Sequence, residues 1–461
     1  MAEKQSTKPA RGTRDFLPDD VRRREYVIRI VREVYERYGF EPLETPAFEN
    51  IETLTGKYGE EGNQLIFKIL KRGEHEKSDE ADLALRYDLT VPLARVVAEY
   101  QGRLPTLFKR YQIQPVWRAD RPARGRFREF YQCDIDSVGS TSPIVEVEQI
   151  SAVCEILTAL GFRRFQVRLN HRGLLTRLLN AAAIPPHQHV DTLVALDKFD
   201  KIGIEGVAKD LHARGIGALQ SGPLLTTFEK AKSVSDINTA LWSAAGTNDM
   251  WLEEFGRDFP EEPAMAALET IVKLASATAA EPWLAIDPSL ARGLSYYTGA
   301  IMEIAVEGIG SLGGGGRYDN LVGMFLGRDV PACGFSLGLE RIIVVMTERE
   351  MFPASVVKSA VDIVVTFLDE AARADALRLA GELRAGRFRV DVYPDVARKF
   401  DKPLKYASAR GARVMAIFGE NEVTRGEASI RNLETREQQT VPRSEAAAHV
   451  ARLLNPGTLE R

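Results

Sequence analysis

The sequence predicts an α+β fold: an antiparallel sheet flanked by helices, interrupted by a helical insertion and followed by a small α/β domain. Three observations predict it. Between residues 104 and 138, short strand-like runs alternate with arginine-rich turns, as in antiparallel hairpins. Residues 172–283 are rich in Ala and Leu and helical in pattern. Over residues 361–461, buried-type strands alternate with helices, which is typical of a small parallel α/β unit.

The first element is a helix that we expect Asp19 or Asp20 to cap and Gly39 to end. Apolar residues recur along it at three- and four-residue spacing. They are Val27, Ile30, Val31, Val34 and Tyr38. Residues 40–48 follow as extended chain, because the prolines at 42 and 46 push the residues before them out of the helical region.

The later elements divide the chain into four expected segments. A helix over 150–162, strands over 165–169 and 299–306 and a strand-to-helix run over 338–348 belong to one domain, with 351–360 as a linker. In the last segment, the strands are expected at 361–368, 388–394 and 412–419. The predicted boundaries are 1–171 and 284–350 for the two halves of the first domain, 172–283 for the insertion and 361–461 for the last domain.

Bulk composition limits the possible partners. A formal net charge of −4 over 461 residues gives no overall attraction to nucleic acid or to anionic membranes, so a polyanion must meet a local basic patch.

The odd number of scattered cysteines, Cys133, Cys154 and Cys333, favours free thiols in a reduced cytosol. The polar N-terminus lacks the apolar run of a signal peptide, and no apolar run reaches the ~20 residues of a membrane helix. We therefore expect a cytoplasmic protein without a membrane segment.

Two glycine motifs match enzyme signatures by letter but lack the surrounding elements those signatures require. Gly334–Gly338 reads G-x-S-x-G, but a serine hydrolase also needs a strong preceding strand and a following acid and His. Here a proline interrupts the preceding run, and His449 is the only histidine that follows. Ser336 is therefore interpreted as a small residue that leaves room for a ligand, and alanine should be tolerated there. Gly308–Gly313 reads G-x-G-x-x-G but lacks a following helix, so we interpret it as a glycine-lined wall.

Arginines are concentrated between residues 101 and 132, where eight basic residues face two acidic ones. Seven of the eight are arginines and aromatic residues interleave with them, a pattern that suits phosphate groups and a stacked purine base better than a plain charged hairpin does. Arg292, beside two tyrosines, and Arg341, after the small residues of 334–338, add to this set. The sequence therefore favours a nucleotide or nucleic-acid phosphate site.

At these positions the sequence resembles the class II aminoacyl-tRNA synthetases, and specifically the histidyl-tRNA synthetase family. Residues 334–341, GFSLGLER, are similar to the third class II motif, residues 116–136 to the second, and Pro46 stands where the first has its proline. Segments similar to histidine-specific ones are RGTRDFLP, LRYDLTVPLAR and ARGLSYYTGAIMEI. The resemblance covers nearly the whole chain and continues through 399–435, which is similar to the family's anticodon-binding domain.

The resemblance implies a mixed, mostly antiparallel catalytic sheet of the class II type and a two-step reaction. Histidine and ATP form histidyl-adenylate, and the histidyl group then passes to tRNA-His. By resemblance, Arg118 binds the α-phosphate and the histidine carboxylate, Arg341 binds the γ-phosphate, and Arg292 acts on the α-phosphate. Phe127 stacks on adenine and Asp120 joins the ATP site. Mg²⁺ on the outer phosphates and a homodimer are also implied.

The same resemblance assigns the histidine pocket. The α-amino end is held by Asp88, Thr90 and Gln132, with Arg118 and Arg292 at the carboxylate. The imidazole ring is surrounded by Asp136, Tyr296 and Tyr297. Metal ligands are not identified. Buried groups that the wrong substrate leaves unpaired can discriminate by about 10⁴-fold.

Two positions depart from the family pattern, and one alternative function stays open. Ser295 stands where an aspartate is common, which loosens ring recognition or changes a supporting bond. Ala123 stands where many bacterial members have glutamine, which weakens any transfer of contacts to the 5′ end of the tRNA. The alternative is the histidine-sensing regulatory subunit of ATP phosphoribosyltransferase. Such regulators lack the C-terminal domain and usually the catalytic arginines, both of which this chain has.

Overall fold

The structure is a computed structural model that divides into two compact units, Met1–Met351 and Phe352–Arg461. It describes residues 6–71, 80–241, 246–259, 262–292, 296–306, 308–357, 361–397 and 399–454. No helix in these ranges is long and apolar enough to cross a membrane.

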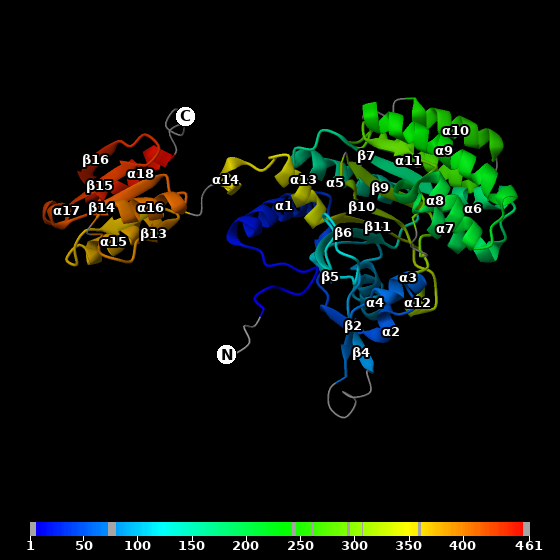
Figure 1. Cartoon of the computed structure of the whole chain (residues 1–461), viewed down its shortest axis with the longest axis horizontal. Coiled ribbons are helices and arrows are strands. Elements are labelled where there is room, and N and C mark those ends of the chain that lie inside the picture. The colour runs from blue at the N-terminus through cyan, green and yellow to red at the C-terminus, as the bar shows by residue number, and fades with distance from the viewer. Residues whose placement is uncertain are drawn as a thin grey trace. The chain divides into compact units, whose positions relative to one another are not determined.

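An 8-stranded mixed sheet forms the centre of the first unit (Figure 1). The two outer pairs are parallel, and the strands between them pair antiparallel, as expected. In spatial order the strands are β1 (Glu41–Pro42), β5 (Phe108–Trp117), β6 (Glu129–Val138), β11 (Ala332–Gly338), β10 (Gly310–Arg317), β9 (Ala300–Val306), β7 (Phe165–His171) and β8 (Leu284–Ile286).

Three helices pack together beside this sheet: α1 (Pro18–Arg37), α5 (Ile144–Ala159) and α13 (Leu339–Glu348). The expected cap of α1 is wrong. The helix begins at Pro18, Leu17 is the capping residue, and no side chain makes a capping hydrogen bond. Proline is favoured at the first helical position because its missing N–H would have no partner there. The two aspartates lie inside the first turn, where their negative charge interacts favourably with the positive end of the helix dipole.

Helices fill the stretch between β7 and β8, shown in green in Figure 1. They are α6 (Arg172–Ala181), the 3₁₀ turn η2 (Pro186–Gln188), α7 (His189–Leu196), α8 (Phe199–Ala213), α9 (Ala218–Leu241), α10 (Thr247–Asp258) and α11 (Pro263–Ala275). α11 packs on α5 and β7, while α8 packs on both α7 and α9.

A small 3-stranded sheet and short helices complete the first unit. The sheet has the order β2-β4-β3. The elements are β2 (Phe48–Asn50), α2 (Ile51–Leu54), α3 (Gly59–Gln64), β3 (Lys68–Leu70), β4 (Ala81–Leu85), α4 (Thr90–Tyr100) and α12 (Gly323–Leu326). Residues 40–48 are extended or irregular, as the two prolines predict.

The second unit has a 5-stranded sheet in the order β13-β12-β14-β15-β16. β13, β12 and β14 are parallel, as expected, whereas the hairpin of β15 and β16 is antiparallel and was missed. Alternate residues of β12 enter two apolar clusters, Ile363 and Val365 in one and Val364 in the other, so helices cover both faces. The elements are α14 (Ala354–Val357), β12 (Ile363–Phe367), α15 (Arg373–Ala385), β13 (Val390–Val392), α16 (Asp401–Ala409), β14 (Val414–Phe418), α17 (Glu420–Arg425), β15 (Glu427–Asn432), β16 (Gln438–Pro442), η3 (Arg443–Glu445) and α18 (Ala446–Leu454).

Candidate active site

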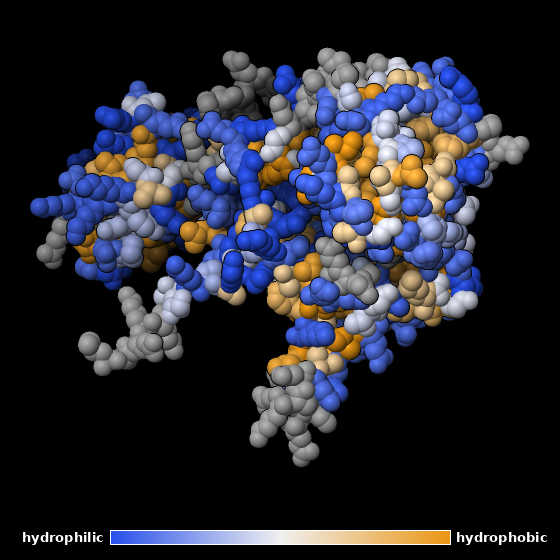
Figure 2. Space-filling view, turned by 45° about the vertical axis from the view of Figure 1, so that its right-hand side comes forward, coloured by the Kyte–Doolittle hydropathy of each residue, from blue (hydrophilic) through white to orange (hydrophobic). Residues whose placement is uncertain are grey.

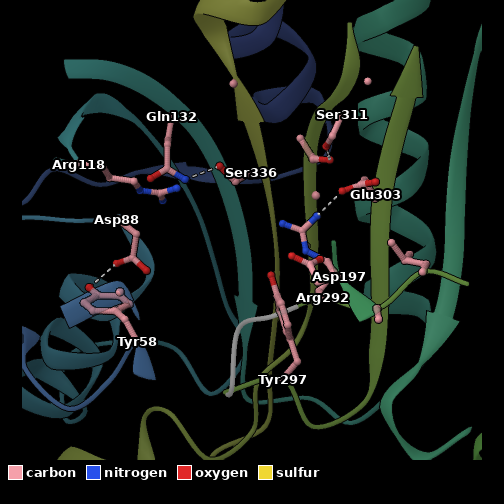
Figure 3. A pocket seen from close by; sticks show the side chains of 18 of the residues that line it. Tyr58, Asp88, Arg118, Gln132, Asp197, Arg292, Tyr297, Glu303, Ser311 and Ser336 are labelled. Atoms are coloured by element: carbon pink, nitrogen blue, oxygen red, sulfur yellow. Dashed lines mark hydrogen bonds and ion pairs between the residues drawn. The ribbon is translucent and has the colours of Figure 1, made fainter. Parts of the chain in front are cut away.

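A cavity of about 1110 Å³ opens on the large sheet and is shown from close by in Figure 3. Its walls come from β6, β9, β10 and β11, from the loop between β5 and β6, and from α7 and α8. Every site residue named above lines it: Asp88, Thr90, Arg118, Asp120, Phe127, Gln132, Asp136, Arg292, Tyr296, Tyr297 and Arg341. Segments more than two hundred residues apart in the sequence thus meet at one place.

Arg118 is held at the end of β5 by backbone and aromatic contacts. Its Nε donates to the Tyr87 carbonyl at 3.0 Å, and its guanidinium carbon lies 4.3 Å from the centre of the Tyr87 ring and 5.2 Å from that of Phe130. Aromatic faces attract a cation without neutralising it. Arg118 therefore keeps donors available for an anion in the cavity.

Arg292 stands in an ionic network that sequence reasoning did not foresee. Its Nη1 lies 3.2 Å from Glu303 Oε2 on β9, a contact drawn in Figure 3. The other oxygen of Glu303 lies 3.3 Å from Arg168 on β7, which also contacts Asp287 at 2.6 Å and Asp200 of α8 at 2.9 Å. Burial lowers the pKa of Arg292, but Tyr297, Glu303 and further acidic neighbours outweigh this and raise it. Arg292 is thus fixed in position and remains charged.

Arg341 and Phe127 both line the cavity. Arg341 donates from Nη1 to the Ser311 carbonyl, and burial followed by the charge of Arg126 lowers its pKa. The Arg14 guanidinium carbon lies 3.8 Å from the centre of the Phe127 ring, so the N-terminal segment covers one face of that ring.

Asp88 and Gln132 carry the polar groups at the end assigned to the α-amine. Asp88 Oδ1 accepts hydrogen bonds from Tyr58 Oη at 2.9 Å and from the Val91 N–H at 3.1 Å (Figure 3). Burial raises the pKa of Asp88, and these hydrogen bonds and Arg118 oppose the rise. Gln132 Nε2 donates to Ser336 Oγ at 2.7 Å. The Ser336 hydroxyl therefore has a hydrogen-bonding partner, which the interpretation of Ser336 as merely small did not foresee.

Asp136 is buried in the cavity wall, and both of its carboxylate oxygens already have protein partners. Its Oδ2 is 2.7 Å from Arg110 Nη2, and its Oδ1 accepts a hydrogen bond from the Tyr318 hydroxyl. Burial raises the pKa of Asp136 to about 6, against the lowering effect of Arg110. Tyr296 and Tyr297 are buried nearby with their ring centres 5.0 Å apart. Ser295, the position that departs from the family pattern, lies outside the described residues.

The glycine strand forms a wall because side chains from neighbouring segments fill its surface. A Cβ at Gly314 would lie 2.0 Å from Arg292 Nη1, and one at Gly334 would lie 1.9 Å from Asp136 Oδ1. Both distances are far below van der Waals contact. Gly308–Gly313 spans the turn between the antiparallel strands β9 and β10, so it is no dinucleotide-binding βαβ unit. Ser336 lies within β11, and the described residues that line the cavity include no histidine, which excludes the hydrolase arrangement.

Comparison with known proteins agrees with this geometry. The family model described as histidyl-tRNA synthetase matches residues 12–342, and an anticodon-binding domain model matches residues 360–453. The chain belongs to the histidyl-tRNA synthetase family. A relative from Gloeobacter violaceus, named histidine–tRNA ligase, is 40% identical over 95% of this chain and 97% of its own length.

Solved structures extend the comparison. The crystal structure of histidyl-tRNA synthetase from Nostoc sp. PCC 7120 superimposes with a TM-score of 0.77 at 29% identity, covering 97% of this chain and all of the other. A Bacillus halodurans protein titled ATP phosphoribosyltransferase regulatory subunit/histidyl-tRNA synthetase covers 88% of this chain and 98% of its own, at 20% identity and a TM-score of 0.67. At that identity the likeness shows the fold alone. The fold by itself therefore does not separate enzyme from regulator. The nearly full-length relatives at 38–40% identity do, because they are named histidine–tRNA ligase, which supports the enzyme over the regulatory subunit.

Proposed function

We propose that this chain activates L-histidine with ATP to histidyl-adenylate and transfers the histidyl group to the 3′ end of tRNA-His. The supporting observation is that the three arginines assigned to the substrates line a single cavity together with buried aspartates. The arginines suit the phosphates and the substrate carboxylate, and the carboxylates suit the ammonium and imidazole groups. These residues are Arg118, Arg292 and Arg341, with Asp88, Asp134 and Asp136.

In the first step, a carboxylate oxygen of histidine attacks the α-phosphorus of ATP. A P–O bond forms, the bond to the bridging oxygen breaks, and pyrophosphate leaves with the electron pair. Arg118 and Arg292 stabilise the negative charge that develops on the α-phosphate, and Arg341 binds the γ-phosphate. Cations fixed in advance stabilise this charge without reorganising. The Phe127 ring stacks on adenine, and Asp120 completes the ATP site.

In the second step, a ribose hydroxyl at the tRNA 3′ end attacks the histidyl carbonyl carbon, and AMP leaves with the electrons of the mixed-anhydride bond. The hydroxyl proton passes to the departing phosphate or to solvent. We assign the chemistry to residues 1–171 and 284–350, acceptor-end contacts to 172–283 and anticodon recognition to 361–461.

Histidine is oriented by polar groups at both ends. Asp88, Thr90 and Gln132 hold the α-ammonium group. Asp136, with Tyr296 and Tyr297, surrounds the imidazole ring, although Arg110 and Tyr318 already occupy the Asp136 carboxylate. The engaged carboxylate therefore shapes the inner end of the pocket and holds Tyr318 in place.

Mg²⁺ fits this site as an ion bound mainly by ATP. In the described part of the chain, no cluster of three metal-ligating side chains occurs. Mg²⁺ typically binds one or two carboxylates together with substrate phosphates. Asp120 lines the cavity, and its charge opposes the lowering of the Arg341 pKa by burial, so Asp120 is the carboxylate that would hold the ion. Both oxygens of Glu303 are already in ion pairs, with Arg292 at 3.2 Å and with Arg168 at 3.3 Å. When bound, the ion neutralises charge on the outer phosphates.

We further propose a homodimer and a cytoplasmic location. The small sheet presents apolar surface, orange in Figure 2, where Phe48 and Leu70 are each 52% exposed. They lie on the two outer strands, β2 and β3, and we assign this face of the small sheet to the partner subunit. Light scattering should give twice the chain mass, and Phe48→Glu should shift the dimer towards monomer. The three free, buried thiols favour a reducing compartment, which cell fractionation checks.

Pyrophosphate exchange tests the proposed function. Labelled pyrophosphate should enter ATP when histidine is present and not with the other amino acids, without tRNA. Exchange with a different amino acid would refute the substrate assignment. Histidine binding without any exchange would favour the regulatory subunit, which needs a histidine pocket but not three arginines at the phosphates.

A further inference from the structure

Strand β6 carries three buried acceptor oxygens without a hydrogen-bond donor among the described residues, and Asp136 Oδ2 is the one of them that has a cation, Arg110 Nη2 at 2.7 Å. The other two belong to Gln132 and Asp134. Gln132 Oε1 and Asp134 Oδ1 are buried, and neither has a hydrogen-bond partner among the described residues. Gln132 is 8% exposed and Asp134 is 2% exposed. Both residues line the cavity. Because they are two positions apart on one strand, their side chains leave the same face about 6.7 Å apart.

Ser336 lies beside both side chains. Gln132 Nε2 donates to Ser336 Oγ at 2.7 Å. Burial raises the pKa of Asp134, and the nearby Ser336 hydroxyl opposes this rise. The strand register places Ser336 directly opposite Asp134. A serine hydroxyl has one donor and two acceptor sites, so after it accepts from the Gln132 amide its own O–H is available to the Asp134 carboxylate opposite. The two remaining oxygens, Gln132 Oε1 and Asp134 Oδ1, are left for a ligand.

Asp134 differs from Asp136 in what surrounds it. Asp136 has a cation at 2.7 Å and a tyrosine hydroxyl on its second oxygen. Asp134 Oδ1 has neither, and burial raises the Asp134 pKa to about 7, against the lowering effect of Arg110. An unpaired buried acceptor costs about 1–3 kcal/mol. A ligand that brings an N–H to this atom recovers that cost.

We propose that Asp134 Oδ1 accepts the ring N–H of bound histidine, while Gln132 Oε1 faces the α-ammonium group. This assignment rests on the proposed function and adds a specificity residue that the sequence did not indicate. Histidine has N–H donors at both ends, which match these two acceptors of β6. A side chain of similar shape without an N–H leaves Asp134 unpaired in a buried site, and such a mismatch discriminates strongly.

The test compares Asp134→Ala and Asp134→Asn in histidine-dependent pyrophosphate exchange. Alanine should raise the KM for histidine about 10- to 100-fold, the worth of a hydrogen bond to a charged group, and leave the KM for ATP within twofold. Asparagine retains an acceptor oxygen, so its KM for histidine should lie between those of wild type and alanine. Inhibition by β-(2-thienyl)alanine, whose ring lacks an N–H, provides a second readout. Wild type should prefer histidine strongly, and this preference should shrink by the same factor in Asp134→Ala.

Ser137→Ala is the matched control, because Ser137 is a buried neighbour on β6 that does not line the cavity. The proposal is overturned if Asp134→Ala keeps the wild-type KM for histidine and the wild-type preference, or if the KM values for histidine and ATP rise together. Should alanine prevent folding, the asparagine variant decides the matter: a KM for histidine and a thienylalanine preference equal to wild type overturn the proposal. Absence of histidine exchange in the wild type would instead refute the proposed function.

Discussion

Replacing Glu303 by Gln tests whether the position of Arg292 depends on its ion pair. The substitution keeps the size of the side chain and removes its charge. Arg168 retains Asp287 and Asp200, whereas Arg292 loses the carboxylate that lies 3.2 Å from its Nη1. The main consequence should therefore fall on Arg292.

The expected magnitude follows from exposure and distance. Two unit charges about 4 Å apart interact by about 4 kcal/mol at an effective dielectric constant of about 20. Glu303 and Arg292 are each 21% exposed, so solvent screens part of this, and the glutamine amide retains one hydrogen bond. We expect a loss of about 1.5–3 kcal/mol, the range for hydrogen bonds to charged groups. If the whole loss falls on the transition state, the activation barrier rises by this amount and kcat falls about 10- to 150-fold.

Pyrophosphate exchange at saturating histidine and ATP measures this kcat, and the two KM values are measured alongside it. We expect kcat to fall while both KM values change less than threefold. Asp200→Asn is the control, because it removes a partner of Arg168 on α8 and leaves the pair of Glu303 with Arg292 intact. A kcat within twofold of wild type in Glu303→Gln, with Arg292→Ala strongly impaired, would refute the positioning role.

Three further predictions concern the walls of the cavity. Ser336→Ala removes the acceptor for Gln132 Nε2 and should lower kcat/KM for histidine about tenfold in the exchange assay, whereas unchanged kinetics would show that only size matters at this position. Gly314→Ala should lower activity at least about 10-fold and reduce thermal stability, since its Cβ would lie 2.0 Å from Arg292 Nη1; a fully active variant would contradict the close approach. The folded-state pKa of Asp134, about 7, lies above its unfolded value, so the free energy of unfolding of wild type falls as pH rises from about 4 to 7. Asp134→Asn lacks this titration, so denaturant titrations should show its stability rising relative to that of wild type over the same interval. A stability difference independent of pH would contradict the raised pKa.

Local sequence signals predicted much of the fold. Three- and four-residue apolar spacing predicted α1, and the arginine-rich turn between two strand-like runs predicted the hairpin of β5 and β6. Glycine content predicted a wall rather than a dinucleotide site. The cap of α1 was wrong because an aspartate before a helix and one inside its first turn look alike in sequence. The hairpin of β15 and β16 was missed because polar residues interrupt its strands.

The site residues that family motifs marked all line one cavity, whereas the contacts that depend on tertiary structure alone were missed. The contacts of Glu303 with Arg168 and Arg292 depend on the pairing of β7 with β9, which no local pattern specifies. Arg14 on Phe127 joins residues more than a hundred positions apart. Asp134 could have been found, since a residue two positions after Gln132 on a strand faces the same side.

Single-turnover formation of histidyl-adenylate by Arg292→Ala tests most directly whether the cavity arginines carry the chemistry. Wild type and variant are mixed with saturating ATP and histidine, and equilibrium dialysis measures histidine binding separately. We predict a rate at least about 100-fold below wild type, about 2.7 kcal/mol in the barrier, with the dissociation constant for histidine changed by less than about tenfold. Adenylate formation at the wild-type rate would contradict the role given to Arg292 and the account built on it.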